Sequence, residues 1–139
     1  MDLVQLIYAS TVSEQFKESD LSVILGSAKQ RNNAESVTGI LCFNGKNFMQ
    51  CLEGGRRQVN TIYANILADE RHQDAELLTY GPIDKRSYSQ WEMGLVPQEA
   101  LTHSLNLLYT ASGQFAPYEM SGASAEQYLR AMRTAIPLL

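Results

Sequence analysis

The spacing of apolar residues along the chain predicts five strands and four helices. Apolar and polar residues that alternate with a period of two mark strands, and apolar residues three or four apart mark helices. The predicted strands cover residues 3–10, 37–43, 46–53, 76–80 and 91–96. The predicted helices cover residues 20–31, 56–68, 98–110 and 124–136.

The order of these elements favours an α+β fold. Up to residue 97 it reads βαββαββ, which is close to a ferredoxin-like sheet with an extra strand and two helices on one face. The two C-terminal helices are too short for a separate domain, so we expect them to pack on the sheet, on each other or on a partner. We therefore divide the chain into residues 1–97 and an extension of residues 98–139 on the same domain.

The second and third strands are joined by Asn44–Gly45, the dipeptide most typical of a tight hairpin turn. A two-residue turn at this dipeptide places Cys42 opposite Asn47 and Cys51 opposite Thr38. The two cysteines are then not opposite each other, so we expect no disulfide.

Three further signals predict where helices begin. Ser19 or Asp20 can cap the first helix. Pro97 is a natural first-turn residue for the helix over 98–110. Residues 124–127 resemble a capping box at the start of the last helix.

Two polar residues stand out on apolar strand faces. Gln50 shares a face with Phe48 and Leu52, and Tyr8 lies on the apolar face of the first strand. A buried amide without a partner costs about 1–3 kcal/mol. The two side chains could simply satisfy each other, or Gln50 could face solvent; alternatively, both face a polar-edged ligand between the sheet and the helices.

Composition and charge narrow the function. The 139 residues are 45% hydrophobic and 19% charged, with a formal net charge of -4. The only local cluster of basic residues is Arg56–Arg57, which is too small for a basic face, so direct nucleic-acid binding is not expected. Neither a signal peptide nor a membrane span is visible, which favours a cytoplasmic protein. His72 and His103 lack companion ligands, so we expect no metal site.

Several short segments, taken in their order along the chain, resemble a known family, the BLUF domain, a blue-light sensor that uses FAD. The resemblance covers roughly residues 2–97 and depends on the order of its landmarks rather than on any one of them. The landmarks are Tyr8-Ala9-Ser10, Asn32, Thr38-Gly39-Ile40-Leu41, Phe48-Met49-Gln50-Cys51-Leu52-Glu53-Gly54, Asp69-Glu70-Arg71-His72 and Trp91-Glu92-Met93.

The resemblance implies a photochemical switch. Tyr8 would donate an electron and a proton to the excited flavin. Gln50 would lie between Tyr8 and the flavin ring and rearrange after illumination. Met93 would approach Gln50 from the fifth strand, with Trp91 as its neighbour in the rearrangement; Trp91 could also be ordinary core.

The resemblance also implies a flavin site. Asn32 would bond the polar edge of the ring, and Ile24 and Ile66 would sandwich it, although both isoleucines could equally be core. The remaining expected contacts are Ser10, Phe48, Leu52, Asp69, Arg71 and His72. The last three could instead be a solvated helix end.

Two positions depart from the family pattern. Arg31 stands where some members carry His or Asn, and Asn65 stands where a relative has a basic residue. These departures concern the outer part of the flavin rather than Tyr8 and Gln50.

The sequence thus predicts a photoreceptor with FAD, or with FMN or riboflavin, and no enzymatic activity. Because the sequence ends at Leu139, we expect its output to go to a separate signalling protein or through a homo-oligomer. A second possibility is an enzyme, such as a flavin reductase or an acylphosphatase-like hydrolase. The sequence gives it no support, because it contains neither a Gly-rich phosphate loop nor a Ser/His/Asp set. A cofactor-free interaction module is the third possibility.

Overall fold

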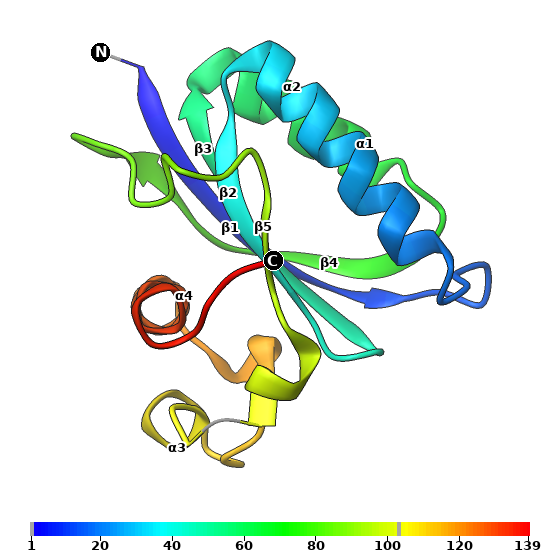
Figure 1. The fold of residues 1–139 in the computed structure, drawn as a ribbon, viewed down its shortest axis with the longest axis vertical. Helices are drawn as coiled ribbons and strands as arrows, with labels where there is room; N and C mark the ends of the chain where they lie inside the picture. Colours follow the sequence, from blue (N-terminus) through cyan, green and yellow to red (C-terminus); the bar gives the residue numbers. More distant parts are fainter. Residues whose placement is uncertain (1, 103) are drawn as a thin grey trace.

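Five strands form one mixed sheet with helices on both of its faces (Figure 1). The structure is a computed structural model that describes residues 2–102 and 104–139. The strands are β1 (Leu3–Val12), β2 (Thr38–Phe43), β3 (Asn47–Gly55), β4 (His72–Pro82) and β5 (Gly94–Val96). The α-helices are α1 (Asp20–Glu35), α2 (Arg56–Leu67), α3 (Asn106–Tyr109) and α4 (Gly122–Ala135), and the 3-10 helices are η1 (Gln98–Thr102) and η2 (Pro117–Glu119).

The strand order in the sheet is β4-β1-β3-β2-β5. The β2–β5 pair is parallel, and the other three neighbouring pairs are antiparallel. The first four strands and the helices α1 and α2 form the ferredoxin-like unit, to which β5 adds a strand at the β2 edge. This confirms the α+β fold predicted from the pattern.

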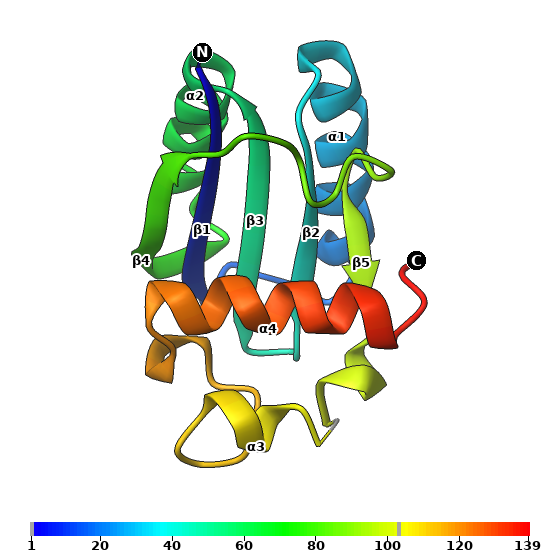
Figure 2. The ribbon, with the colours of Figure 1, turned by 90° about the vertical axis from the view of Figure 1, so that its left-hand side faces the viewer.

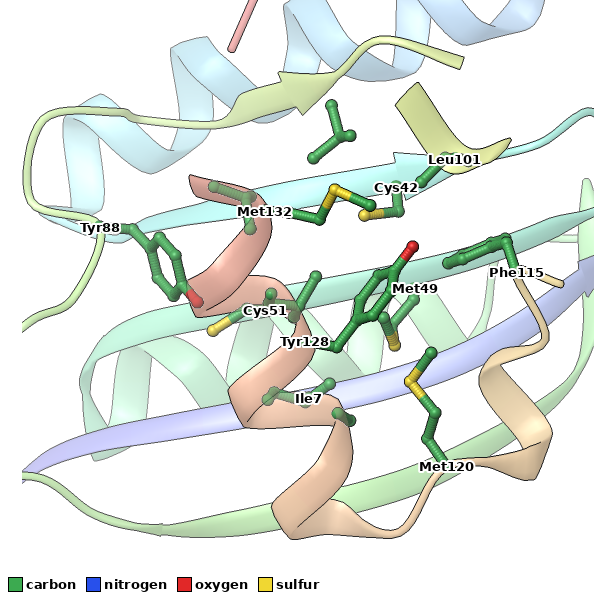
Figure 3. Packing of buried hydrophobic residues seen from close by; sticks show 14 residues of the cluster. Ile7, Cys42, Met49, Cys51, Tyr88, Leu101, Phe115, Met120, Tyr128 and Met132 are labelled. Atoms are coloured by element: carbon green, nitrogen blue, oxygen red, sulfur yellow. The ribbon is translucent and has the colours of Figure 1, made fainter. Parts of the chain in front are cut away.

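The two faces of the sheet bury two separate apolar cores. Helices α1 and α2 cover one face, and α4 runs across the strands on the other (Figures 1 and 2). The helix-pair core, under α1 and α2, contains Val4, Leu6, Tyr8, Ala28, Val37, Leu41, Phe43, Phe48, Leu52, Val59, Ile62 and Met93. The α4 core contains Ile7, Ile40, Cys42, Met49, Cys51, Tyr88, Val96, Leu101, Phe115, Met120, Ala125, Tyr128, Leu129 and Met132 (Figure 3).

Alternation along β1 and β3 decides which side chain joins which core. Tyr8 and Gln50 face α1 and α2, whereas Ile7 and Cys51 face α4. The strand faces predicted from the sequence are therefore correct. Cys42 and Cys51 are both free and buried, and burial raises the pKa of each thiol.

The hairpin between β2 and β3 is wider than predicted. Cys42 lies opposite Met49 and Cys51 opposite Ile40, so the register differs by two from that of a two-residue turn. The side chain of Asn44 explains the wider turn, because its Oδ1 accepts from the backbone N–H groups of Lys46 and Asn47 at 3.0 and 2.7 Å. A shift of two preserves the face of every side chain, so only the pairing was wrong.

The predicted helix over 98–110 is also wrong, because η1 and the short α3 replace it. Side chains take the backbone carbonyls that a continuous helix would use. Thr102 Oγ1 donates to Glu99 O at 2.8 Å, and Asn106 Nδ2 donates to Leu101 O at 2.7 Å. Such bonds compete with a helical ladder and divide the segment.

The start of α4 and the cap of α1 differ from the prediction, whereas α1 itself begins at Asp20 as predicted. Helix α4 begins at Gly122, not at the expected capping box, because Ser121 Oγ accepts from Ser124 N at 3.1 Å. At α1, Ser19 makes no side-chain cap bond, and Asp20 Oδ2 accepts from Lys17 N instead.

The last strand is shorter than the predicted 91–96. Trp91 O accepts from Gly39 N at 3.1 Å, while Glu92 O accepts from Asn32 Nδ2 at 2.7 Å. Because a helix side chain takes one of these carbonyls, regular pairing begins only at β5. On its other edge, β5 pairs with the C-terminal residue through the backbones of Leu95 and Leu139.

Candidate functional site

A cavity lies between α1, α2 and the sheet. Its lining residues are Tyr8, Ile24, Ser27, Ala28, Arg31, Leu41, Phe48, Gln50, Asn65, Ile66, Asp69, Arg71 and His72. Its volume is about 110 Å³, of the order of an apolar cavity that holds a benzene ring. Ser27 on α1 and Asn65 on α2 are exposed, so the cavity opens to solvent between the two helices.

Tyr8 and Gln50 form the centre of the cavity's sheet side. Register places them opposite each other on β1 and β3, and only 4% and 5% of their surfaces are exposed. Tyr8 Oη donates to Gln50 Oε1 at 2.5 Å. Burial raises the pKa of the Tyr8 hydroxyl, so the phenol keeps its proton in the resting protein.

Met93 is the second partner of Gln50. Gln50 Nε2 donates to Met93 Sδ at 3.4 Å, and Met93 is buried in the helix-pair core just before β5. The amide thus joins a donor on β1 to an acceptor beside β5. Since a thioether sulfur can only accept, this arrangement requires the amide oxygen to point to Tyr8.

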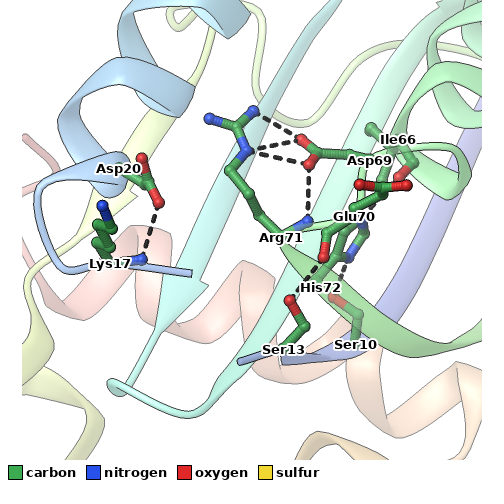
Figure 4. Close-up of polar contacts among 9 residues, drawn as sticks. All are labelled: Ser10, Ser13, Lys17, Asp20, Ile66, Asp69, Glu70, Arg71 and His72. Carbon is green, nitrogen blue, oxygen red and sulfur yellow. Dashed lines mark hydrogen bonds and ion pairs between the residues drawn. The ribbon is translucent and has the colours of Figure 1, made fainter. Parts of the chain in front are cut away.

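The far side of the cavity carries a charged fork at the end of α2 (Figure 4). Arg71 Nη2 lies 2.6 Å from Asp69 Oδ2, and Arg71 Nε lies 3.0 Å from Asp69 Oδ1. The hydrogen bonds from Arg71 lower the pKa of Asp69, and the same bonds raise the pKa of Arg71. A fork of this kind is preorganised because its members hold each other.

His72 is engaged with the protein on both ring nitrogens (Figure 4). Its Nδ1 lies 2.8 Å from Ser10 Oγ and its Nε2 lies 2.5 Å from Ile66 O. A carbonyl only accepts, so Nε2 carries a hydrogen and donates it. The ring therefore holds the start of β4 against β1 and α2, and one side of it reaches the cavity.

The structure brings together eight of the predicted site residues around this cavity. They are Tyr8, Ile24, Phe48, Gln50, Ile66, Asp69, Arg71 and His72. Met93 lies behind Gln50 and contacts it through the amide.

Four other predicted residues do not line the cavity. Ser10 turns to His72, and Leu52 is fully buried in the helix-pair core. Asn32 is fully buried and donates to Glu92 O rather than pointing into the cavity. Trp91 packs against the α4 core, on the opposite side of the sheet from Gln50.

Five lining residues were not among the predicted contacts: Ser27, Ala28, Arg31, Leu41 and Asn65. Two of them carry a signal in the sequence. Ala28 follows Ile24 by one helical turn, so the same helix stripe reaches both. Leu41 lies on the helix-pair face of β2, as alternation from Gly39 indicates.

Arg31 and Asn65 add polar groups at the mouth of the cavity. Arg31 Nε donates to Asn32 Oδ1 at 3.4 Å, and burial lowers the pKa of the Arg31 guanidinium. These are the positions that depart from the family pattern, and pattern alone does not indicate how far their side chains reach.

Within residues 2–102 and 104–139, no three His, Cys, Asp or Glu side chains gather as a metal site. His72 is fully engaged by protein atoms; the expectation about His103 lies outside the described residues. The helices of this same part of the chain are all too short or too polar to span a bilayer.

Fold and cavity together define a small α+β domain with a lined cavity that combines apolar walls with a few polar side chains. Comparison with known proteins identifies the class. The family described as "Sensors of blue-light using FAD" matches residues 3–94. The chain therefore belongs to the BLUF family, as the ordered landmarks of the sequence predict.

Three relatives support this. The photoactivated adenylate cyclase subunit beta of Euglena gracilis is 34% identical over 100 residues, which are 71% of this chain and 12% of that protein. The blue light- and temperature-regulated antirepressor BluF of Escherichia coli (strain K12) is 42% identical over 82 residues, 58% of this chain and 20% of that protein. The solved structure of the BlsA photo-activated state superposes with a TM-score of 0.83 at 28% identity and covers 96% of each chain.

This chain spans at most a fifth of these two curated relatives and so corresponds to one part of each. That part is a sensor of blue light that uses a flavin, which agrees with the expectation that the chain is not an enzyme. By name, one of these two relatives is an adenylate cyclase and the other an antirepressor.

Proposed function

We propose that this chain is a blue-light sensor in which Tyr8, Gln50 and Met93 form the switch beside a bound FAD. The observation that carries the proposal is the hydrogen-bonded row from Tyr8 Oη through the Gln50 amide to Met93 Sδ, with Tyr8 and Gln50 at the wall of the cavity. An amide in that position can reverse its donor and acceptor ends by rotating about one bond.

The residues around the cavity fit a flavin. Ile24 and Ile66, one from each helix, supply apolar faces for a ring, and the second N–H of Gln50 is free to reach a polar ring edge. Arg31, Asn65 and the Asp69–Arg71 fork lie where the rest of the cofactor would leave the cavity. FMN and riboflavin carry the same ring, so either could replace FAD.

A bound flavin would supply the light absorption and, in its excited state, the oxidising power for the reaction. Tyr8 is the donor in this proposal, and its proton moves along the 2.5 Å bond toward Gln50 Oε1. The Gln50 amide would rotate after this transfer and would stay rotated once Tyr8 has regained its electron and its proton.

Rotation has a direct consequence for Met93. In the resting protein Gln50 Nε2 donates to Met93 Sδ. After rotation an oxygen lone pair faces the sulfur, and two acceptors repel each other. Met93 then loses its partner, and the shift passes to β5 and to the neighbouring Trp91.

We infer that residues 1–97 sense light and that residues 98–139 pass the change to a separate protein. Helix α4 packs on the sheet face opposite the cavity, so it can respond to strand movement without contact to the flavin. A switch of this kind needs two arrangements of similar free energy. A homo-oligomer, a cytoplasmic location and the absence of direct nucleic-acid binding remain predictions.

The test is spectroscopic. Purified protein should be yellow, and blue light should cause a small, reversible red shift of the flavin absorption. Tyr8→Phe and Gln50→Ala should each retain flavin and lose this shift, because one removes the donor and the other the rotating amide. Leu67→Ala, an exposed residue of α2 that does not line the cavity, serves as the control and should photocycle normally.

Three outcomes would contradict parts of the proposal. A colourless protein that takes up no flavin would rule out the sensor. Bleaching by NAD(P)H would favour a reductase. Normal photocycles in both variants would remove Tyr8 and Gln50 from the switch.

A further inference from the structure

A buried carboxylate holds the segment that precedes Met93. Glu53 lies three residues after Gln50 on β3, on the face toward α4, and none of its surface is exposed. Its Oε1 accepts from the backbone N–H groups of Ser87 and Tyr88 at 3.0 and 2.9 Å. This contact joins the strand that carries the switch glutamine to the segment that carries its methionine partner.

Further contacts complete the attachment of this segment to β3. Glu53 Oε2 accepts from Gln5 Nε2 at 3.0 Å and from Ser87 N at 3.0 Å. The backbone oxygen of Glu53 accepts from Arg86 Nη1 at 2.9 Å. Both carboxylate oxygens are thus used as acceptors from N–H groups, a role that an amide in place of the carboxylate cannot fill.

The same segment is attached to α4. Arg133 Nη1 donates to Ser87 O, and the Arg133 guanidinium lies 5.8 Å from the centroid of the Tyr88 ring. Tyr88 is buried in the α4 core, where Figure 3 shows it beside Met132 and Cys51. Ser87 and Tyr88 therefore touch Glu53 on one side and α4 on the other.

These contacts form a continuous connection between the switch and α4. Met93 follows Tyr88 by five residues, and Trp91 N donates to Tyr88 O at 3.1 Å between them. Met93 is thus linked through Trp91 to Tyr88, whose ring the Arg133 guanidinium contacts.

We propose that Glu53 is a positioning residue for the light response, which fixes residues 86–93 so that movement of Met93 is passed through Tyr88 and Arg133 to α4. The inference rests on the proposed function and adds a residue and a route to it. Glu53 lies on the opposite face of β3 from Gln50, so the photochemistry beside the flavin does not depend on it directly.

The test separates positioning from mere stabilisation by measuring the chemical step and its transmission in one sample. Glu53→Gln has nearly the same shape but, in either orientation of the amide, places an N–H donor against the Ser87 N–H, which bonds both carboxylate oxygens. The variant should keep flavin and the reversible red shift. In the dark, the amides of Ser87 and Tyr88 should exchange hydrogen about tenfold faster, because their charged acceptor is gone.

The deciding readout is the difference in hydrogen exchange between light and dark in α4. In the unaltered protein, we expect illumination to change exchange in residues 84–93 and in α4. In Glu53→Gln, the change in α4 should fall at least about threefold while the red shift persists. Glu92→Gln, which alters an exposed acid of the same segment, is the matched control and should respond as the unaltered protein does.

Arg133→Gln tests the other end and decides the matter if Glu53→Gln fails to fold. It removes the guanidinium from Tyr88 and leaves the Glu53 contacts in place, so only the α4 response should fall. The backbone pair of Leu95 and Leu139 is intact in both variants. A full α4 response in a variant that folds would overturn the proposal. It would favour transmission through the backbone pair of Leu95 and Leu139 instead.

The outcomes distinguish this inference from the proposed function. Without a red shift in the unaltered protein, the sensor itself fails. With a red shift but no light-dependent exchange in residues 84–93 or α4, the sensor stands and the route through Glu53 is wrong.

Discussion

The Asp69–Arg71 fork shows how two charged residues can be placed by each other rather than by a core. Both side chains are partly exposed, and Asp69 Oδ1 also accepts from Arg71 N at 2.9 Å. The two residues are only two positions apart, so the end of α2 sets their geometry locally. Both residues line the cavity, so the pair presents a fixed polar group there.

Replacing Asp69 should lower the free energy of unfolding only at pH values at which the carboxylate is ionised. Hydrogen bonds from Arg71 lower the pKa of Asp69 in the folded state, so its contribution is present above about pH 4 and is lost as the pH falls below it. Asp69→Asn should lower the free energy of unfolding at pH 7 by less than about 1 kcal/mol, because the pair is partly exposed. Urea unfolding at pH 7 and near pH 3 measures this.

The difference between the two proteins should shrink at the lower pH. Asp84→Asn, an exposed acid away from the cavity, is the control and should show little effect at either pH. A loss that grew toward low pH would contradict the role given to the fork.

Among the elements, the C-terminal segments depend on hydrogen bonds between side chains and distant groups. Asn106 is the clearest case. It is buried, its Nδ2 donates to Leu101 O, and its Oδ1 accepts from Tyr128 Oη on α4 at 2.7 Å. The short α3 is thus held to η1 and α4 by one amide.

Tyr128→Phe should destabilise the protein by about 1–2 kcal/mol, because it leaves a buried acceptor on Asn106 without its donor. The flavin red shift should be unchanged, since Tyr128 lies on the α4 side of the sheet. Urea unfolding followed by circular dichroism provides the measurement. Tyr80→Phe, at the exposed edge of the sheet, is the control, and an equal loss there would refute the argument.

For the whole molecule, the decisive feature is that one sheet separates two apolar cores. The helix-pair core surrounds the cavity, and the α4 core holds the C-terminal extension. Neighbouring residues of β1 and β3 contribute to opposite cores, so neither core can form without the same strands. We expect the two to unfold together.

Leu129→Ala tests this coupling. Leu129 is fully buried between α4 and the sheet, and truncation of such a leucine costs about 2–5 kcal/mol. Unfolding followed by flavin absorbance and by circular dichroism should shift together, although the proposed flavin site lies on the other face of the sheet. Leu108→Ala, an exposed position, should shift neither; separate transitions in Leu129→Ala would show that the cores are independent.

Much of the fold was predictable because alternation and helical spacing follow from backbone geometry alone. Val4, Leu6 and Tyr8 were assigned to one face by counting, and the structure agrees. The segment 98–110 was not predictable in this way. Its apolar spacing permits a helix, but Thr102 and Asn106 bond the carbonyls that a helix needs.

The residues of the candidate site also fall into those that regular spacing places and those that a distant partner places. Residues on regular elements, such as Ile24 and Gln50, were expected at the cavity and line it. Arg31 and Asn32 are adjacent on α1, and their roles depend on which one faces the cavity. Asn32 is turned away from the cavity because its Nδ2 donates to Glu92 O, a partner sixty residues away.

By itself, the sequence determined the order of the elements up to residue 97, the face of each residue on β1 and β3, and membership of the BLUF family. These follow from local periodicity and from landmarks in a fixed order. Only the tertiary structure decided the hairpin register, the partner of Asn32 and the attachment of residues 86–93 to Glu53. The hairpin register depends on Asn44 bonding the backbone of its own turn, which apolar spacing does not indicate. The other two depend on a polar side chain meeting a group far along the chain, and such pairs form only when packing brings the groups together and excludes water from them.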